Sequence, residues 1–253
     1  MTRAEITKEH YRKYNNLYAQ ILPVPIMQAY THKDPYITQG FLAGLIDFKK
    51  NDHVLDAGSG WGGPAIFFAK NFDIKILGIN NNKQQVLWSN QYTKKEKVKN
   101  VSFKYHDFHE LYSLPSEKCF DKILFLQSIG HSKNLNHILK ECRKVLAEDG
   151  TINIYTMFGK SSGTKAEKEQ TEYTEKCYGY NPYKKDYFIK QANDCGYDAE
   201  FFNTAIDFYP HYAAQFEHVC SQDDKNWEKL FNLNMKHGWE CFDMEFIKLK
   251  KQE

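Results

Sequence analysis

The sequence predicts an α/β fold: a seven-stranded, mostly parallel sheet with helices on both faces, an antiparallel last strand and a helical lid. Apolar segments of strand length alternate with amphipathic segments as far as residue 158, an order typical of βαβ units with right-handed crossovers. Two further alternating segments near the C-terminus predict an antiparallel pair, which is a common addition to a parallel sheet.

The predicted strands are short apolar segments bounded by polar or glycine-containing turns. In order they are HVLDAG (53–58), DIKILGI (73–79), VSFKYHD (101–107), FDKILFLQS (120–128), TINIYTMF (151–158), AEFFNTAIDFY (199–209) and WECFDMEFIKLKK (239–251). Their length and composition are those of half-buried or buried strands.

The predicted helices have apolar residues at helical spacing. They cover residues 11–23, 61–71, 83–97, 135–150, 182–197 and 211–238. Residues 159–181 are polar and interrupted by tyrosines, and we expect a loop or a short helical cap there. Pro182 then favours the start of the next helix.

Size and charge favour one domain that binds a small molecule. The chain has 253 residues, and its 34 basic and 32 acidic side chains are not gathered into blocks that would bind nucleic acid. We expect one domain over residues 1–253, with an N-terminal lid (1–40), a cofactor-binding core (41–158), and lid insertions with the C-terminal strands (159–253). The oligomeric state stays open.

The cysteines and the absence of long apolar segments favour a cytoplasmic protein. Six cysteines lie at scattered positions without a CxxC pair, as expected for reduced thiols. No signal-peptide core and no run of 18 apolar residues occurs, so we expect no stable membrane insertion. Aromatic residues make up 15% of the chain, which suits either an aromatic core or a pocket for an apolar or cationic ligand.

The segment VLDAGSGWGGP (54–64) predicts a nucleotide-binding turn. Its glycines follow a strand and open a helix, so the backbone can approach a ligand. Read literally, it also matches the dinucleotide pattern Gly-x-Gly-x-x-Gly. However, Asp56 would repel a pyrophosphate, and Asn80 stands where an NAD site carries an acid. S-adenosylmethionine has no phosphate and carries an ammonium and a sulfonium, so an acid at this loop would attract it.

A phosphate-binding loop at the segment GKS (159–161) is excluded by its spacing. Ile154 occupies the position where that motif requires its first glycine. Lys160 and Ser161 are therefore expected to lie in an exposed loop.

Four ordered motifs resemble the class I S-adenosylmethionine-dependent methyltransferases, which have a Rossmann-like fold. The first, at residues 54–64, is similar to that of sterol C-methyltransferases and cyclopropane fatty acid synthases. The second, GINNNKQQV (78–86), resembles the sterol enzymes. The third and fourth are YHDFHEL (105–111) and FDKILFLQSIGHSKNL (120–135), and the fourth also resembles phosphoethanolamine methyltransferases.

The resemblance implies roles for eight residues toward S-adenosylmethionine. Asp56, Gly58 and Gly60 would surround its methionine end, Asn80 and Gln85 would meet the ribose, Asp107 the adenine amino group with Phe108 beside the ring, and Gln127 the methionine moiety or the transferring methyl. Simpler roles stay open for some of them. Asp56 and Asn80 are also good helix caps, and Asp107 is a common turn residue.

Methyl transfer from a sulfonium requires alignment of acceptor, methyl and sulfur, and often removal of a proton. His131 follows the fourth strand and is the predicted base; the alternative is a surface histidine. Tyr36, in a segment similar to one in phosphobase methyltransferases, is predicted to close over the cofactor, and Tyr14 or Tyr18 of the N-terminal helix are further candidates for this role. The alternative is that these tyrosines are half-buried, with their hydroxyls in water. His106 and His109 lack a third ligand at a recognisable spacing, so we expect no metal.

The predicted function is therefore S-adenosylmethionine-dependent methylation of a small, lipophilic or aromatic molecule, with C-methylation of an alkene or terpenoid-like acceptor favoured. An O- or N-methyltransferase of a natural product or phosphobase is the alternative. Gly130 replaces the glutamate of the cyclopropane synthases' Glu-His pair, which argues against that activity. Two other classes stay open: an NAD(P)-dependent oxidoreductase and a non-catalytic cofactor-binding module.

Overall fold

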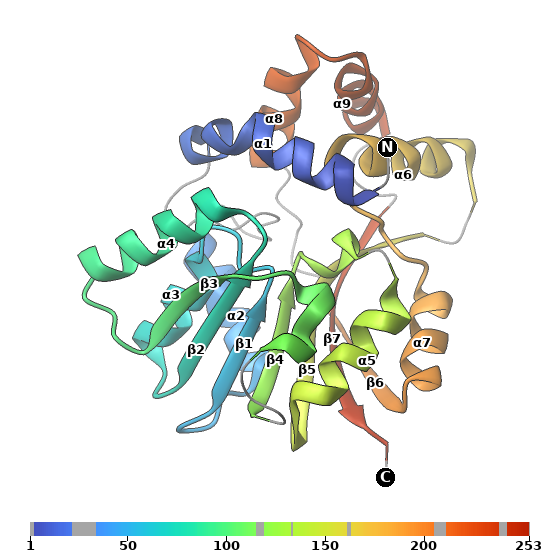
Figure 1. Cartoon of the computed structure of the whole chain (residues 1–253). Coiled ribbons are helices and arrows are strands. Elements are labelled where there is room, and N and C mark those ends of the chain that lie inside the picture. The colour runs from blue at the N-terminus through green and yellow to red at the C-terminus, as the bar shows by residue number, and fades with distance from the viewer. Residues whose placement is uncertain are drawn as a thin grey trace.

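Within the described residues, seven strands form one sheet in the order β3-β2-β1-β4-β5-β7-β6 (Figure 1). The structure is a computed structural model that describes residues 3–21, 34–114, 119–132, 134–160, 163–204, 211–237 and 242–252. The strands are β1 (His53–Ala57), β2 (Lys75–Asn80), β3 (Val101–Tyr105), β4 (Phe120–Leu126), β5 (Leu146–Gly159), β6 (Tyr197–Asn203) and β7 (Phe242–Lys251). Strands β1 to β5 pair in parallel, whereas β7 pairs antiparallel with both β5 and β6.

The predicted mostly parallel sheet with an antiparallel last strand is confirmed, although several boundaries differ. The helix expected over 135–150 ends at Val145, because Leu146 already pairs with Phe120 in the sheet. Strand β6 begins at Tyr197, inside the predicted helix 182–197. The ends of two predicted strands, at 205–209 and 239–241, lie outside the described residues.

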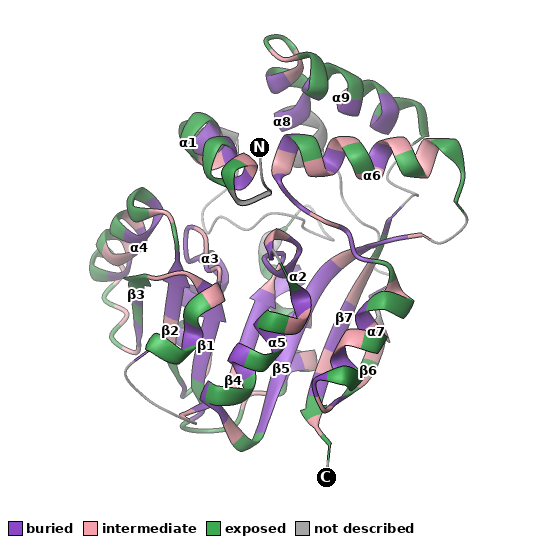
Figure 2. Cartoon of the chain, turned by 45° about the vertical axis from the view of Figure 1, so that its right-hand side comes forward, coloured by how far each residue is buried: buried purple, intermediate pink, exposed green. Residues whose placement is uncertain are grey.

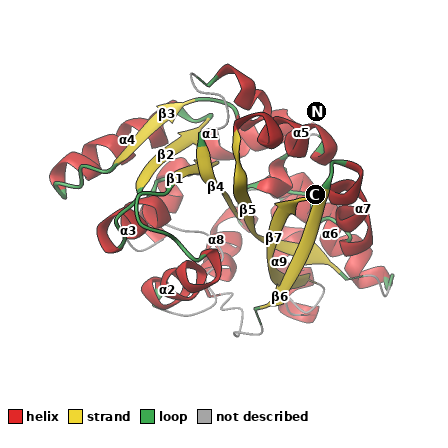
Figure 3. Ribbon diagram, turned by 90° about the horizontal axis from the view of Figure 1, so that it is seen from below, coloured by secondary structure: helices red, strands yellow, loops and turns green. Residues whose placement is uncertain are grey.

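Helices cover both faces of the sheet (Figure 3). Helices α2 (Pro35–Ile46), α3 (Gly63–Asn71) and α4 (Lys83–Lys95) pack on one face, and α5 (Leu135–Val145) and α7 (Lys185–Asp194) on the other. Neighbouring residues Val54 and Leu55 belong to the two different hydrophobic clusters, as the alternation of side chains along a strand requires. The central strands β1, β4 and β5 are accordingly mostly buried between the layers, whereas the edge strand β3 is largely exposed (Figure 2).

Among the described residues, four helices form a cap over the carboxyl ends of the parallel strands β1 to β5 (Figure 1). They are α1 (Arg3–Ile21), α6 (Lys165–Tyr178), α8 (His211–Ser221) and α9 (Lys225–His237). Of the two alternatives expected over residues 159–181, a loop or a short helical cap, the structure has a helix, which is 14 residues long. Thr164 and Glu167 form a capping box at its start, and Gly179 ends it at a φ of 64°. The predicted helix 211–238 is divided into α8 and α9.

The cap does not include α2. Leu42, Ala43 and Ile46 of α2 are buried in the cluster that also contains sheet residues Leu124 and Phe246. The lid boundary predicted at residue 40 therefore falls inside a helix of the sheet layer. No helix among the described residues combines the length and the apolar character needed to cross a membrane.

The interior of the cap is aromatic and contains a buried acid. Tyr18 stacks on Phe216 at 4.2 Å between ring centroids, and Tyr178 packs edge-on against Trp227 at 4.7 Å. Beside them, the carboxyl of Glu217 accepts hydrogen bonds from the Tyr178 hydroxyl at 3.0 Å and from Nδ2 of Asn234 at 2.9 Å. Burial raises the pKa of Glu217 to about 7.

The buried acid predicts a pH dependence of stability. Because the folded-state pKa of Glu217 is raised from 4.5, the contribution of this group to the free energy of unfolding is largest below about pH 4.5 and is lost as the pH rises through about 7. At about 1.4 kcal/mol per pKa unit, the loss is about 3 kcal/mol. Glu217→Gln should remove this part of the slope in urea unfolding measured from pH 4.5 to 8. Parallel stability curves for variant and wild type would contradict the assignment.

Candidate functional site

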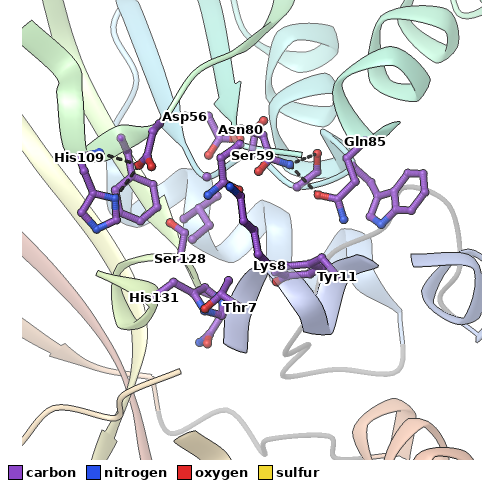
Figure 4. Close-up of a pocket in the computed structure, with 18 of the residues that line it drawn as sticks. Thr7, Lys8, Tyr11, Asp56, Ser59, Asn80, Gln85, His109, Ser128 and His131 are labelled. Atoms are coloured by element: carbon purple, nitrogen blue, oxygen red, sulfur yellow. Dashed lines mark hydrogen bonds and ion pairs between the residues drawn. The ribbon is translucent and has the colours of Figure 1, made fainter. Parts of the chain in front are cut away.

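A cavity of about 370 Å³ lies between the carboxyl ends of β1, β2 and β4 on one side and α1 on the other (Figure 4). The chain order reverses between β1 and β4, and ligands of open α/β sheets bind at such a point. The lining includes all but one of the predicted site residues: Asp56, Gly58, Gly60, Asn80, Gln85, Asp107, Phe108, Gln127 and His131.

The glycine loop between β1 and α3 is shaped by close contacts. Gly58 has a φ of 85°, and a Cβ atom there would lie 2.5 Å from Cβ of Ser128. Its backbone N–H donates to the carbonyl of Ile79 at 2.9 Å, which ties the loop to β2. Gly60 has a φ of 53°, but a Cβ atom there would meet nothing within 4 Å. The loop therefore exposes its backbone to the cavity at Gly60.

Asp56 lies near the end of β1 and is only 2% exposed. Burial raises the pKa of its carboxyl to about 7, far above its ordinary value of 3.8. A cation beside this carboxyl would favour its charged form and lower that pKa again. Asp56 is therefore suited to bind a positively charged group and unsuited to a phosphate.

Asn80 and Gln85 form a chain of hydrogen bonds from the glycine loop to the cap. Nδ2 of Asn80 donates to the carbonyl of Gly60 at 3.2 Å and to Oε1 of Gln85 at 2.6 Å. Nε2 of Gln85 donates to Oδ1 of Asn15 on α1 at 2.8 Å. The two predicted ribose residues thus contact each other and also hold α1 in place.

Asp107 ends the turn after β3 and is paired with His109. Its Oδ1 accepts hydrogen bonds from the backbone N–H of His109 at 3.0 Å and from the His109 ring at 2.5 Å. The His109 ring stacks on Phe108 at 4.7 Å. Asp107 therefore acts as the turn residue that the sequence left open, and it lines the cavity as well.

Gln127 and Ser128 follow β4 in a constrained backbone. Gln127 has a φ of 59°, a conformation that favours glycine and is found at functional sites. Its Nε2 donates to Sδ of Met244 at 3.6 Å, whereas Oγ of Ser128 donates to the carbonyl of Ala57 at 2.5 Å. The residues that follow β4 are therefore held to β7 by one hydrogen bond and to β1 by the other.

His131 lies in the short 3₁₀ helix η2 (Ile129–His131) and joins the sheet to the cap. Its Nδ1 lies 3.1 Å from the carbonyl of Gly179 and 3.4 Å from Oγ1 of Thr7. The Thr7 hydroxyl donates to the same carbonyl, so Nδ1 is the donor in its own contacts. In the neutral ring the lone pair is then on Nε2, as required of a base that acts through that atom.

Tyr36 is the predicted residue that does not line the cavity. It lies in the first turn of α2, is half exposed, and packs against Phe67 at 5.7 Å between ring centroids. Tyr14 and Tyr18, also considered as covering residues, are buried in the cap. Tyr11 lines the cavity instead.

Sequence reasoning also missed the other cavity residues of α1. These are Glu5, Thr7 and Lys8. The available signal was helical spacing, because Glu5, Lys8 and Tyr11 recur every three residues and so share one face.

The two histidines near Asp107 have different partners. The His106 ring bonds the carbonyl of Glu110, whereas the His109 ring bonds Asp107. Among the described residues, no group of three side chains suited to a metal occurs.

Fold and site together define an open α/β protein with a cavity at the point where the strand order reverses, and a buried acid there favours a cation beside the glycine loop. A family model described as a methyltransferase domain matches residues 48–234. The chain belongs to this methyltransferase domain family.

Individual relatives agree with this family. A sterol 24-C-methyltransferase of Debaryomyces hansenii is 29% identical over 169 residues, which are 64% of this chain and 44% of that enzyme. Among solved structures, the [4+2]-cyclase SpnF superposes with a TM-score of 0.78 at 16% identity, covering 100% of this chain and 97% of that one. Phosphoethanolamine N-methyltransferase 2 of Haemonchus contortus, in complex with S-adenosyl-L-methionine, gives 0.74 at 16% identity and covers 98% and 60%.

These comparisons confirm the Rossmann-like methyltransferase fold. The chain spans less than half the length of the Debaryomyces enzyme, and one structure of the same fold is named a cyclase. Since one fold can support several activities, the reaction has to be argued from the site.

Proposed function

We propose that the chain is an S-adenosylmethionine-dependent methyltransferase that acts on a small, lipophilic acceptor and methylates it at carbon. The observation that carries this proposal is the single cavity that joins Asp56, Asn80, Asp107 and His131. Asp56 lies near the end of β1, Asn80 at the end of β2, Asp107 after β3 and His131 after β4. In this order they would meet the methionine tail, the ribose, the adenine and the acceptor.

The residues of the cavity fit the cofactor. Asp56 would hold the ammonium group, the backbone at Gly60 would approach the amino acid tail, and Asn80 would face the ribose. Phe108 offers a ring face and Asp107 a carboxylate for the adenine. When bound, S-adenosylmethionine supplies the methyl group on a positively charged sulfur.

The chain's own residues then have two tasks. The cap over the cavity excludes water, which strengthens electrostatic interactions inside. His131 accepts a proton at Nε2 while the carbonyl of Gly179 holds Nδ1–H. A base is needed whether the acceptor loses a proton from oxygen or nitrogen, or from carbon after an alkene has been methylated.

Aromatic rings near His131 support a carbon acceptor. The ring of Tyr11, which lines the cavity, lies 5.9 Å from that of His131, and the buried Tyr180 packs edge-on against His131 at 5.1 Å from behind the cavity lining. Each aromatic face can stabilise a nearby cation by about 0.5–2 kcal/mol. The sterol 24-C-methyltransferase relatives favour the same acceptor class. An O- or N-methyltransferase would use the same base, with the rings binding a flat or cationic acceptor.

Calorimetry with S-adenosylhomocysteine and with NAD tests the proposed cofactor. We expect binding of the adenosyl compound and none of NAD; the reverse would reject the proposal. Transfer of labelled methyl groups to an alkene-bearing sterol or terpenoid, compared with phosphoethanolamine, tests the acceptor. A protein that binds the cofactor but transfers no methyl group to any acceptor would be a binding module.

We also propose a cytoplasmic location. Cys142, Cys177, Cys195 and Cys220 carry free thiols. Free thiols are maintained in a reducing compartment. Localisation of a tagged protein by microscopy tests this, and an exclusively membrane-bound signal would contradict it.

The raised pKa of Asp56 predicts how cofactor affinity depends on pH. A cation binds the charged carboxylate, so the affinity for S-adenosylmethionine should rise with pH up to about 7 and then level off. Below pH 7 the limiting change is about tenfold per pH unit. In Asp56→Asn the affinity should be lower at pH 8 and the slope should disappear. 5′-Methylthioadenosine, which lacks the amino acid tail, is the control ligand; equal slopes in both proteins would exclude Asp56 as the cause.

A further inference from the structure

The position of α1 above the cavity is determined by contacts at two points. Near its start, Oγ1 of Thr7 donates to the carbonyl of Gly179 at 3.1 Å, next to His131. Further along, Asn15 bonds Gln85 at 2.8 Å and Gln84 at 3.1 Å. Helix α1 therefore runs from the end of β4 across the glycine loop to the start of α4.

The sequence of α1 divides it into two faces. His10, Tyr14 and Tyr18 are buried in the cap. Lys8 and Tyr11, three residues apart, line the cavity. Since each helical residue adds about 1.5 Å along the axis, Lys8 lies about 10 Å before Asn15 and beside Thr7. Lys8 is therefore at the end of the cavity near His131, away from Asn80 and Gln85.

The side chain of Lys8 extends from α1 into the cavity. Figure 4 shows it directed across the cavity toward Ser59 of the glycine loop. It is also the only lysine or arginine among the described residues that line the cavity. The acids there are Glu5, Asp56 and Asp107, the last of them paired with His109.

Without Lys8, the charged side chains of this cavity would match only one of the two charged groups of the cofactor's amino acid tail. The amino acid tail of S-adenosylmethionine carries an ammonium and a carboxylate, and Asp56 accounts for the ammonium alone. A carboxylate next to Asp56 would be repelled unless a cation compensated it. Lys8 is a flexible point charge that can reach such a group from the cap.

We propose that Lys8 binds the α-carboxylate of the cofactor's methionyl end and so makes α1 part of the cofactor site. This inference rests on the proposed function. It also explains why the helix that closes the cavity carries a cation toward the glycine loop, which directly follows the strand that contains Asp56. Because α1 supplies one of the two charges, the cofactor tail and the cap would be held together.

Binding of two ligands to Lys8→Met tests the proposal. S-Adenosylhomocysteine carries the carboxylate, and S-adenosyl-3-thiopropylamine differs from it only by lacking that group. For S-adenosylhomocysteine we expect Kd to rise about 10- to 100-fold in Lys8→Met, the range of a lost hydrogen bond between charged groups. The Kd of the thiopropylamine should change less than about twofold. Lys8→Arg should retain most of the affinity.

Lys13→Met is the matched control. Lys13 lies on the same helix, but it contacts Asp224 of the cap at 4.0 Å and the ring of Tyr14, outside the cavity. This variant should bind both ligands like the wild type. Calorimetry gives all the constants, so no acceptor is needed.

Two results would overturn the proposal. If Lys8→Met lowered the affinity for both ligands equally, the substitution would disturb the whole cavity and would not remove one charge pair. An unchanged Kd for S-adenosylhomocysteine would assign Lys8 to another anion, such as an acidic acceptor, and a raised KM for that acceptor would identify it. Failure of the wild type to bind S-adenosylhomocysteine would instead reject the proposed function.

Discussion

Gly58→Ala is expected to lower the affinity for S-adenosylhomocysteine more than 100-fold and the free energy of unfolding by about 2–4 kcal/mol. The backbone of Gly58 has a φ of 85°, which disfavours any residue with a Cβ atom. The new methyl group would lie 2.5 Å from Cβ of Ser128. Calorimetry and urea unfolding measure the two effects.

Relief of this clash is hindered from both sides. Ser128 is held by its hydrogen bond to the carbonyl of Ala57, and Gly58 is held by its N–H bond to Ile79. Either the loop or the end of β4 must move, and both line the cavity.

Gly44→Ala is the control for this prediction. Gly44 lies in α2, where an added Cβ atom meets nothing within 4 Å. In a helix, alanine is favoured over glycine by about 1 kcal/mol, so this variant should bind normally and be slightly more stable. If Gly58→Ala bound the ligand as well as Gly44→Ala does, the close approach of the loop would not matter for binding.

His131→Ala is expected to lower kcat about 10²- to 10⁴-fold, the usual contribution of a general base. The Kd of S-adenosylhomocysteine should change less than about twofold, because His131 is assigned to the acceptor. The rise of activity with pH that reports loss of a proton from the base should disappear as well. Single-turnover measurements at several pH values test this, with the acceptor that the labelled-methyl assay identifies.

His53→Ala serves as the matched histidine control. His53 is exposed at the start of β1, at the opposite edge of the sheet, and its loss should leave kcat unchanged. His131→Gln, which keeps a hydrogen-bonding group but no base, should resemble His131→Ala. Normal turnover in His131→Ala with intact cofactor binding would exclude His131 as the base.

The sheet could be predicted from the sequence because its signal is local. Each strand is an apolar segment such as Val54–Leu55, and the two sheet faces demand apolar residues on both sides of the central strands. Over α6 the sequence left a loop and a short helical cap as alternatives, because the exposed face of this helix is polar and its sequence resembles a loop. The Thr164–Glu167 capping box, which marks the start of this helix, was present in the sequence, but it consists of only two residues.

Most of the candidate site could be predicted for a geometric reason. Asp56, Asn80 and Asp107 lie at or just after the carboxyl ends of three parallel strands that pair side by side, so their side chains come to one edge of the sheet. Chain order and strand direction are enough to place them there. Their individual roles toward a cofactor remain predictions.

Tyr36 shows where such reasoning ends. A tyrosine near a predicted lid is a sensible covering residue, but the segment folds as the first turn of α2 and turns the ring toward Phe67. Which face of a helix meets the cavity depends on how that helix packs, and packing joins residues far apart in the chain.

The sequence by itself determined the order of strands and helices, the glycine loop and the polar residues at the strand ends, because these depend on local composition and on chain direction. Only the tertiary structure decided that Lys8 and Tyr11 of α1 cover the cavity, that Gly179 orients the ring of His131, and that Ser128 leaves no room beside Gly58. These depend on contacts between segments separated by 48 to 172 positions, for which a single sequence carries no periodic signal.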